Sequence, residues 1–239
     1  ALCPAQRSTS INIYNHNIAS GSQPQAAASH ITDLLAMTPQ KALLLINEGN
    51  AARQHFDLPA AGWSHIWRAN PHEGRGNAIF VRSAVANMMS SWVETMEQSW
   101  EHLQPKDPRV YPVVKVSLVN EPWVQFHCVN VHFPTNRQPT INAAARQESV
   151  DRLIALSASM PELPLIICGD FNMGVGEVRQ RIGNPIGGRV FSDTSVDHII
   201  VRDGIDVVFG DTVNVHRIDR FISDHWALRY NVTFKEKNS

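Results

Sequence analysis

The sequence predicts one α/β domain, built from mixed β-sheets with helices packed on them. Its 239 residues, 43% of them hydrophobic, suffice for one sizeable core. Short apolar runs that end at turn residues alternate with stretches of helical periodicity. Several runs follow each other closely enough to form hairpins, so the order predicts an α/β sandwich and not a purely parallel sheet.

Strand patterns are either alternating polar and apolar residues or short continuous apolar runs. They occur at residues 10–18, 41–46, 77–81, 110–119, 123–133, 163–168, 196–201 and 226–234. Apolar residues at helical spacing predict helices over residues 25–37 and 142–157. Residues 84–109 are harder to interpret, because Met and Trp side chains three to four apart are compatible with a helix whose stripe faces the core.

No linker, repeat or low-complexity segment divides the chain. We therefore expect a flexible arm over residues 1–9, one domain over residues 10–235 and a tail over residues 236–239. No stretch approaches the roughly 20 apolar residues of a membrane span.

Charge and cysteine content narrow the class of protein. A net charge of −1 argues against a protein that holds long duplexes by charge alone, but not against an enzyme with a few local arginines and a cation. Cys128 and Cys168 lie in apolar runs and are expected to be buried free thiols. The odd cysteine count and the lack of a signal-like segment favour a cytoplasmic protein, with secretion after removal of a signal peptide as the alternative.

Two short acidic motifs each follow a predicted strand. Gly169-Asp170-Phe171-Asn172 follows an apolar run that ends at Cys168, and Ser223-Asp224-His225 follows Phe221-Ile222. Taken singly, either motif is equally well explained as a turn or a helix cap. Chemistry in α/β proteins, however, concentrates at strand ends and the loops after them.

Polar residues at strand ends from six segments supply what hydrolysis of a phosphate ester needs. They are Asn17, Glu48, His132, Asp170, Asn172, Asp197, Asp224 and His225. Glu48, with Asp170, Asn172 or Asp224, offers the oxygen ligands that a hard cation prefers. His225 is a candidate base, with Asp197 fixing its tautomer, and His132 and Asn172 are candidate donors to the phosphate.

The order of these segments resembles the endonuclease/exonuclease/phosphatase superfamily, the deoxyribonuclease I-like group. The resemblance extends as spaced motifs over about residues 10–235. It implies a four-layer α/β sandwich, with two packed mixed β-sheets flanked by helices. It also implies hydrolysis of a phosphoester with Mg2+ or Mn2+.

The resemblance further implies a role for each motif. Glu48 and Asp224 are the implied metal ligands, and Asn17 supports the metal or the phosphate. Asp170 orients or activates the nucleophile. Asn172 contacts the phosphate, and His132 donates to the phosphate or the leaving group. His225, paired with Asp197, is the general base or the phosphate clamp.

One position departs from the nuclease pattern. Deoxyribonuclease I-like nucleases pair the first catalytic histidine with a glutamate near the strand at residues 77–81, and the alignment places Arg75 there. Catalytic subunits of cytolethal distending toxins resemble this chain in carrying an arginine around this point. Arg75 is therefore a candidate substrate-binding residue, and the carboxylate partner of His132 stays open.

The favoured function is a metal-dependent nuclease that hydrolyses DNA, with RNA as the less favoured nucleic acid, and we expect a monomer. Trp63, Trp67 and the loop at residues 70–76 offer aromatic and cationic contacts to a nucleotide, although packing explains the two tryptophans equally well. The alternatives are a phosphomonoesterase or lipid phosphodiesterase of the same fold, such as an inositol phosphatase or sphingomyelinase, and a catalytically silent binding protein.

Overall fold

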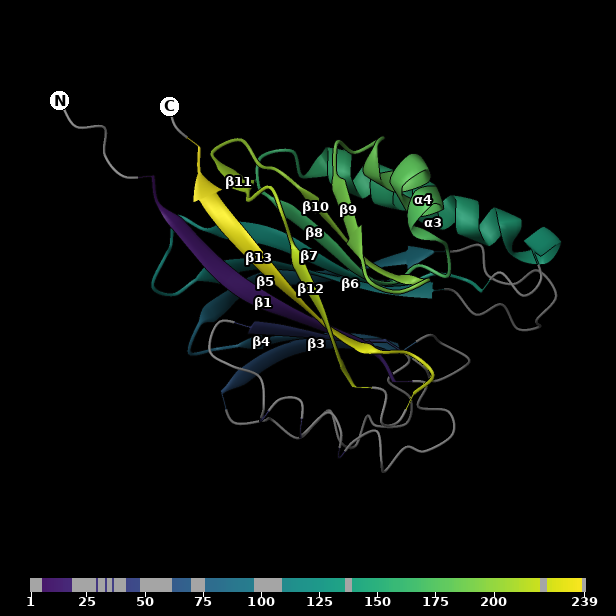
Figure 1. Cartoon of the computed structure of the whole chain (residues 1–239), viewed down its shortest axis with the longest axis horizontal. Coiled ribbons are helices and arrows are strands. Elements are labelled where there is room, and N and C mark those ends of the chain that lie inside the picture. The colour runs from purple at the N-terminus through teal and green to yellow at the C-terminus, as the bar shows by residue number, and fades with distance from the viewer. Residues whose placement is uncertain are drawn as a thin grey trace.

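Two β-sheets packed face to face form the centre of the molecule (Figure 1). The structure is a computed structural model. It describes residues 6–18, 29, 33, 36, 42–47, 62–69, 76–96, 109–135, 139–219 and 223–237.

The first sheet has seven strands in the order β11-β13-β1-β2-β4-β3, with β12 also paired to β13. Only β1 and β2 are parallel among its described pairs. The strands are β1 (Ser8–Asn17), β2 (Ala42–Asn47), β3 (Trp63–Ala69), β4 (Gly76–Arg82), β11 (Val207–Phe209), β12 (Asn214–Asp219) and β13 (Ala227–Glu236).

The second sheet has six strands in the order β5-β6-β7-β8-β10-β9. Here β7 and β8 are parallel and the other described pairs are antiparallel. The strands are β5 (Ala86–Met96), β6 (Arg109–Leu118), β7 (Gln125–His132), β8 (Leu165–Asp170), β9 (Arg189–Ser192) and β10 (Asp197–Arg202).

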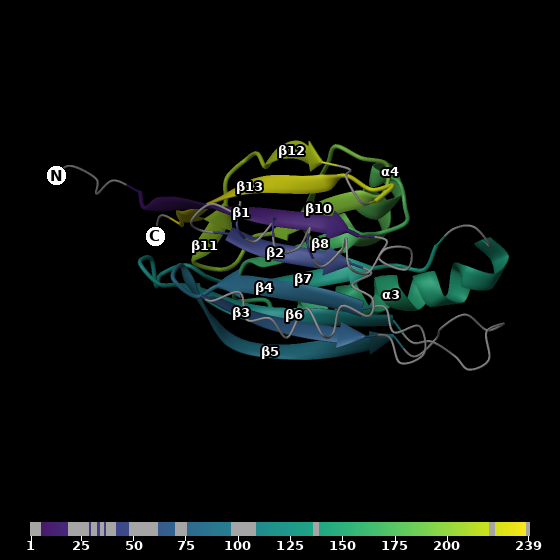
Figure 2. The same cartoon turned by 90° about the horizontal axis from the view of Figure 1, so that it is seen from below.

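The second sheet is buried on both faces because alternate residues of its strands serve two cores. In β8, Ile166 and Cys168 face the first sheet, whereas Leu165 and Ile167 face the opposite way. That opposite face is covered by α3 (Pro139–Ser159), α4 (Val175–Val178) and the π-helical turn η1 (Arg179–Gly183). Figure 1 shows α3 and α4 on this side of the second sheet, and Figure 2, seen from below, has the strands of the first sheet in front. Among the described residues, no helix is long and apolar enough to cross a membrane.

The predicted sandwich of mixed sheets and helices is confirmed, as are the strand patterns and the helix at residues 142–157. Cys128 and Cys168 are buried free thiols, as predicted. Of the helix predicted over residues 25–37, Ser29, Asp33 and Ala36 are helical, and the other positions lie outside the described residues.

The helix considered within residues 84–109 is wrong, because residues 86–96 form the edge strand β5. A register shift between Met88 and Ser90 interrupts its pairing with β6. Trp92 and Met96 pack on the same core four residues apart, a spacing that places two side chains on one face of a strand as well as of a helix.

Candidate active site

The predicted site residues gather at one end of the space between the two sheets. His132, Asp170 and Asp197 continue the faces of β7, β8 and β10 that bury the core between the sheets. Asn17 likewise continues the inward face of β1, beyond Ile11 and Ile13. Apolar residues fill these faces along most of their length, so the polar side chains are confined to the rim.

Strand register puts Asp170 between two other polar side chains. Its Cα partner in parallel β7 is His132, and its partner in antiparallel β10 is Asp197. All three residues are at most 3% exposed. His132 Nε2 lies 3.7 Å from Asp170 Oδ2.

Gly169 allows β8 to lie close to β7 at this point. Its φ of +146° is one that residues with side chains rarely adopt. A β-carbon there would stand 2.0 Å from the carbonyl oxygen of Val131. The glycine of the Gly-Asp-Phe-Asn motif is therefore required by the backbone next to Asp170.

The turn after β8 holds the Asp170 carboxylate in place. Asn172 has a left-handed φ of 49°, which asparagine tolerates better than most residues. Its backbone N–H donates to Asp170 Oδ1 at 2.8 Å. Its side-chain amide donates to the carbonyl oxygen of Phe133 at 2.9 Å, which ties the turn to the end of β7.

The first sheet closes the site from the other side. Asn17 Nδ2 donates to Asp170 Oδ2 at 3.0 Å, between residues 153 positions apart in the chain. Ser223 Oγ donates to the carbonyl oxygen of Asn17 at 2.6 Å. The Ser-Asp-His motif is thereby fixed to the end of β1, and its histidine reaches Asp170.

His225 and Asp197 form a hydrogen-bonded pair across the two sheets. His225 Nδ1 lies 2.9 Å from Asp197 Oδ2, and His225 Nε2 lies 3.7 Å from Asp170 Oδ2. Asp224 Oδ1 lies 3.9 Å from the same Nε2, and its side chain is 75% exposed. The ring is therefore oriented by one carboxylate and presents its other nitrogen to two more.

The surroundings shift the pKa values of both central groups. Burial and the negative charge of Asp197 raise the pKa of Asp170 to about 7, although His225 and hydrogen bonds from Asn172 and Asn17 oppose this. Burial alone would lower the pKa of His225, but Asp197, Asp170 and Asp224 together raise it to about 9. Near neutral pH, a carboxyl group able to accept a proton thus faces a positively charged imidazolium.

Comparison with known proteins assigns the chain to a family. The sequence profile of the Endonuclease/Exonuclease/phosphatase family matches residues 10–225. The chain belongs to this family. None of the curated proteins compared with the chain matches it in sequence.

Solved structures of the endonuclease/exonuclease/phosphatase fold superimpose along most of the chain. D. rerio TDP2 complexed with a single-strand DNA product gives a TM-score of 0.70 at 15% identity, covering 94% of this chain and 99% of that one. The human Nocturnin catalytic domain gives 0.64 at 16% identity, covering 96% and 97%. A mannosyl-6-phosphatase from Bacteroides thetaiotaomicron gives 0.65 at 15% identity, covering 93% and 99%. At 15–16% sequence identity, this structural similarity establishes a shared fold and nothing more specific.

The family implies a divalent cation, and the donor groups of the site fit one. Ligand atoms of Asp170, Asp197 and His225 all lie within 4.8 Å of one another. Asp197 Oδ1 is buried and has no hydrogen-bond partner among the described residues. Carboxylate oxygens are the ligands that Mg2+ and Mn2+ prefer.

A network of buried asparagines lies beneath the site, and the sequence patterns did not predict it. Asn47 Nδ2 lies 3.0 Å from Asn77 Oδ1, 2.8 Å from Asn130 Oδ1 and 2.9 Å from the carbonyl oxygen of Val131. Asn130 donates in turn to the carbonyl oxygen of Ala78 at 2.9 Å. These bonds join β2 and β4 of one sheet to β7 of the other, next to His132.

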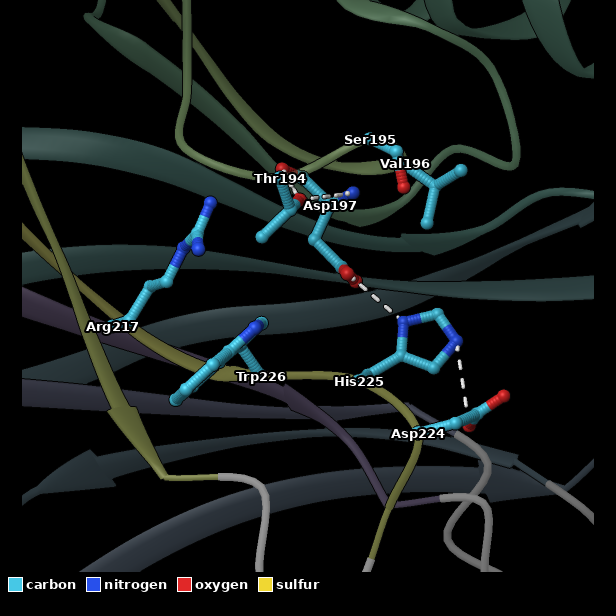
Figure 3. Close-up of a pocket in the computed structure, with 8 residues that line it drawn as sticks. All are labelled: Thr194, Ser195, Val196, Asp197, Arg217, Asp224, His225 and Trp226. Atoms are coloured by element: carbon cyan, nitrogen blue, oxygen red, sulfur yellow. Dashed lines mark hydrogen bonds and ion pairs between the residues drawn. The ribbon is translucent and has the colours of Figure 1, made fainter.

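An open pocket of about 350 Å³ adjoins the His225–Asp197 pair (Figure 3). Its lining includes Thr194, whose hydroxyl bonds the backbone of Asp197, and Trp226, which packs against the core. Arg217 of β12 forms another wall. The sequence did not identify Arg217 or Thr194, because neither lies in a recognisable motif.

The structure thus brings together Asn17, His132, Asp170, Asn172, Asp197 and His225, with Asp224 at the exposed edge. Glu48 and Arg75 lie outside the described residues. His198 faces away from the site, as its place next to Asp197 predicts, and Nε2 lies 2.7 Å from the carbonyl oxygen of Met173.

Proposed function

We propose that the protein is a divalent-metal-dependent phosphodiesterase that hydrolyses DNA by attack of an activated water. The observation that carries this proposal is the placement of the Asp170 carboxylate opposite an imidazole held by Asp197. A proton acceptor and a positive charge then flank one position at which a phosphate can bind.

Asp170 is the proposed proton acceptor. General bases work best when their pKa lies near the working pH, and the pKa of Asp170 is raised to about 7. As the water oxygen bonds to phosphorus, its proton passes to the Asp170 carboxylate. The bond from phosphorus to the leaving oxygen breaks on the opposite side.

His225 is the proposed phosphate clamp, rather than the base. With a pKa of about 9 it carries a proton at neutral pH, so its Nε2–H donates to a phosphoryl oxygen as negative charge builds there. His132, 3.7 Å from Asp170, is the proposed second donor, to the phosphate or the leaving oxygen. Asn17 and Asn172 hold Asp170 in place through the bonds described above.

Glu48 and Asp224 are the proposed metal ligands. A bound Mg2+ or Mn2+ supplies positive charge to the phosphoryl oxygens and lowers the pKa of a bound water. The exposure of Asp224 leaves its carboxylate accessible from solvent.

Phosphomonoesterase activity is the second candidate, because a mannosyl-6-phosphatase shares the fold. TDP2, crystallised with a single-strand DNA product, supports the first. Hydrolysis of bis(p-nitrophenyl) phosphate and of p-nitrophenyl phosphate, each with Mg2+, Mn2+ or EDTA, separates the two. We expect metal-dependent release from the diester to exceed release from the monoester, whereas the reverse order would favour the phosphomonoesterase.

Replacing Asp170 tests the assigned base. Asp170→Asn keeps the shape of the side chain but removes its basicity, so kcat for the diester should fall about 10²–10⁴-fold. Circular dichroism and the unfolding midpoint monitor the fold. A folded Asp170→Asn protein with wild-type kcat would refute the role of Asp170.

A further inference from the structure

A cation stands over an aromatic ring beside the histidine of the site. The guanidinium carbon of Arg217 lies 5.5 Å from the centre of the Trp226 ring. Trp226 directly follows His225, and in Figure 3 Arg217 and His225 lie on either side of the indole. Stacking on a tryptophan anchored against the core fixes the direction of the guanidinium.

Arg217 is held by the backbone carbonyl oxygen and by the carboxylate of Asp193, and a substrate can replace the carboxylate. Its Nε lies 3.0 Å from Asp193 Oδ2 and donates to the Asp193 carbonyl oxygen at 3.0 Å. The two side chains are 45% and 48% exposed. Exposed ion pairs are weak in water, and the planar guanidinium fits phosphate oxygens as well as it fits a carboxylate.

The volume of the pocket exceeds what a single phosphate group needs. A volume of about 350 Å³ lies within the range of roughly 300–1,000 Å³ typical of sites that hold a whole small molecule. Among the described residues that line it, Arg217 and His225 are the basic ones, and Asp224 lines the part next to His225. Anion binding on the side away from Asp224 therefore depends on Arg217.

We propose that Arg217 binds a second phosphate next to the one that is cleaved, and so selects nucleic-acid strands over esters with a single phosphate. This inference rests on the proposed function, because it assigns a substrate feature to the same site. The bound phosphate displaces the Asp193 carboxylate from the guanidinium while the stacking on Trp226 remains.

A purely structural role for Arg217 makes a different prediction. If the arginine only ties β12 to the loop that carries Asp193, then Arg217→Gln should lower kcat/KM alike for a strand and for a diester with one phosphate. If Arg217 binds substrate, removing the competing carboxylate leaves the cation available. Asp193→Asn should then retain or improve activity on a strand.

The test compares the wild type, Arg217→Gln and Asp193→Asn on two substrates under the same metal and pH. One is bis(p-nitrophenyl) phosphate, which carries one phosphate, and the other is a short single-stranded thymidine oligonucleotide. We expect Arg217→Gln to lower the ratio of kcat/KM for the oligonucleotide to kcat/KM for the small diester about five- to tenfold, mainly through KM. The dependence of log KM on log salt should lose about one unit of slope.

An unchanged ratio in Arg217→Gln would overturn the inference. Equal losses in Arg217→Gln and Asp193→Asn would overturn it as well, because they would identify a structural tie. Failure of the wild type to hydrolyse either diester with metal would instead refute the proposed function on which the inference rests.

Discussion

Residue environment, rather than residue type, separates the roles of the two central carboxylates. Asp170 and Asp197 are partners across β8 and β10, and both are buried. Asp197 bonds the imidazole of His225, whereas Asp170 accepts hydrogen bonds from the neutral amide groups of Asn17 and Asn172. In the proposed mechanism, Asp197 therefore orients a cation, and Asp170 accepts a proton from water.

His225 should titrate far above an ordinary histidine when no metal is present. Burial lowers its pKa, but the hydrogen bond and negative charge of Asp197 contribute most to raising it, to about 9. In metal-free protein, Asp197→Asn should move this pKa down toward the usual histidine range, and NMR of the imidazole nitrogens measures the change. The exposed Asp211 offers a control, Asp211→Asn, which should leave the titration of His225 unchanged.

A His225 that titrates in the usual range in the wild type would contradict the proposed imidazolium clamp. That result would return His225 to the role of a general base, which is the other role that the family resemblance implies. An Asp197→Asn variant with the titration of the wild type would show instead that Asp197 does not cause the raised pKa of His225.

At the scale of elements, the strands that hold the site were easier to predict than those that border it. β8 and β10 are continuous apolar runs because both faces are buried. β5 was misread because side chains four residues apart share one face of a strand as well as of a helix. β12 was not predicted, because its alternation of polar and apolar residues is brief and mostly polar. For this reason the sequence also did not identify Arg217, which lies on β12 and lines the pocket.

Gly169→Ala should disturb the close approach of β8 to β7, on which the site depends. A methyl group would meet the backbone of Val131, and the backbone conformation would be strained. Overpacking and φ strain each cost about 1–3 kcal/mol, so we expect the free energy of unfolding to fall by about 2–6 kcal/mol. Urea unfolding measures this loss.

A matched control is Gly176→Ala, in the short helix α4, where a β-carbon has nothing within 4 Å. This variant should have nearly the stability of the wild type. If Gly169→Ala were as stable as Gly176→Ala, the close approach of β7 and β8 would not be a constraint on the fold.

At the scale of the whole molecule, the site exists only because two sheets meet at one rim. Asn17 from the first sheet bonds Asp170 from the second, and His225 bonds Asp197 in the same way. Hydrophobic patterns within short segments predict the strands. Contacts between residues far apart in the chain, such as these two, were expected only because the motifs follow the order found in the family. The asparagines beneath the site were missed because single polar residues inside strands carry no local signal.

Stability should depend on pH through the buried carboxyl group at this junction. The folded-state pKa of Asp170 is about 7, above its ordinary value of 3.8, so the folded state holds the proton more tightly. Its contribution to the unfolding free energy is therefore lost as pH rises from about 4 through about 7, by an amount on the order of a few kcal/mol.

Urea unfolding of metal-free protein at several pH values measures this effect as a difference between proteins. Asp170→Asn cannot ionise, so its stability relative to the wild type should increase from pH 5 to pH 8. A constant difference across that range would show that Asp170 has an ordinary pKa in the folded protein.

If these side chains form one metal-dependent site for cleaving phosphodiesters, the protein should nick DNA. Nicking of supercoiled plasmid tests this most directly, with wild-type protein and His225→Ala, each with Mg2+ or Mn2+ and with EDTA. We predict nicking by the wild type that requires metal, and a loss of about 10²–10⁴-fold in His225→Ala. Absence of nicking by folded wild-type protein, or undiminished metal-dependent nicking by His225→Ala, would contradict the account.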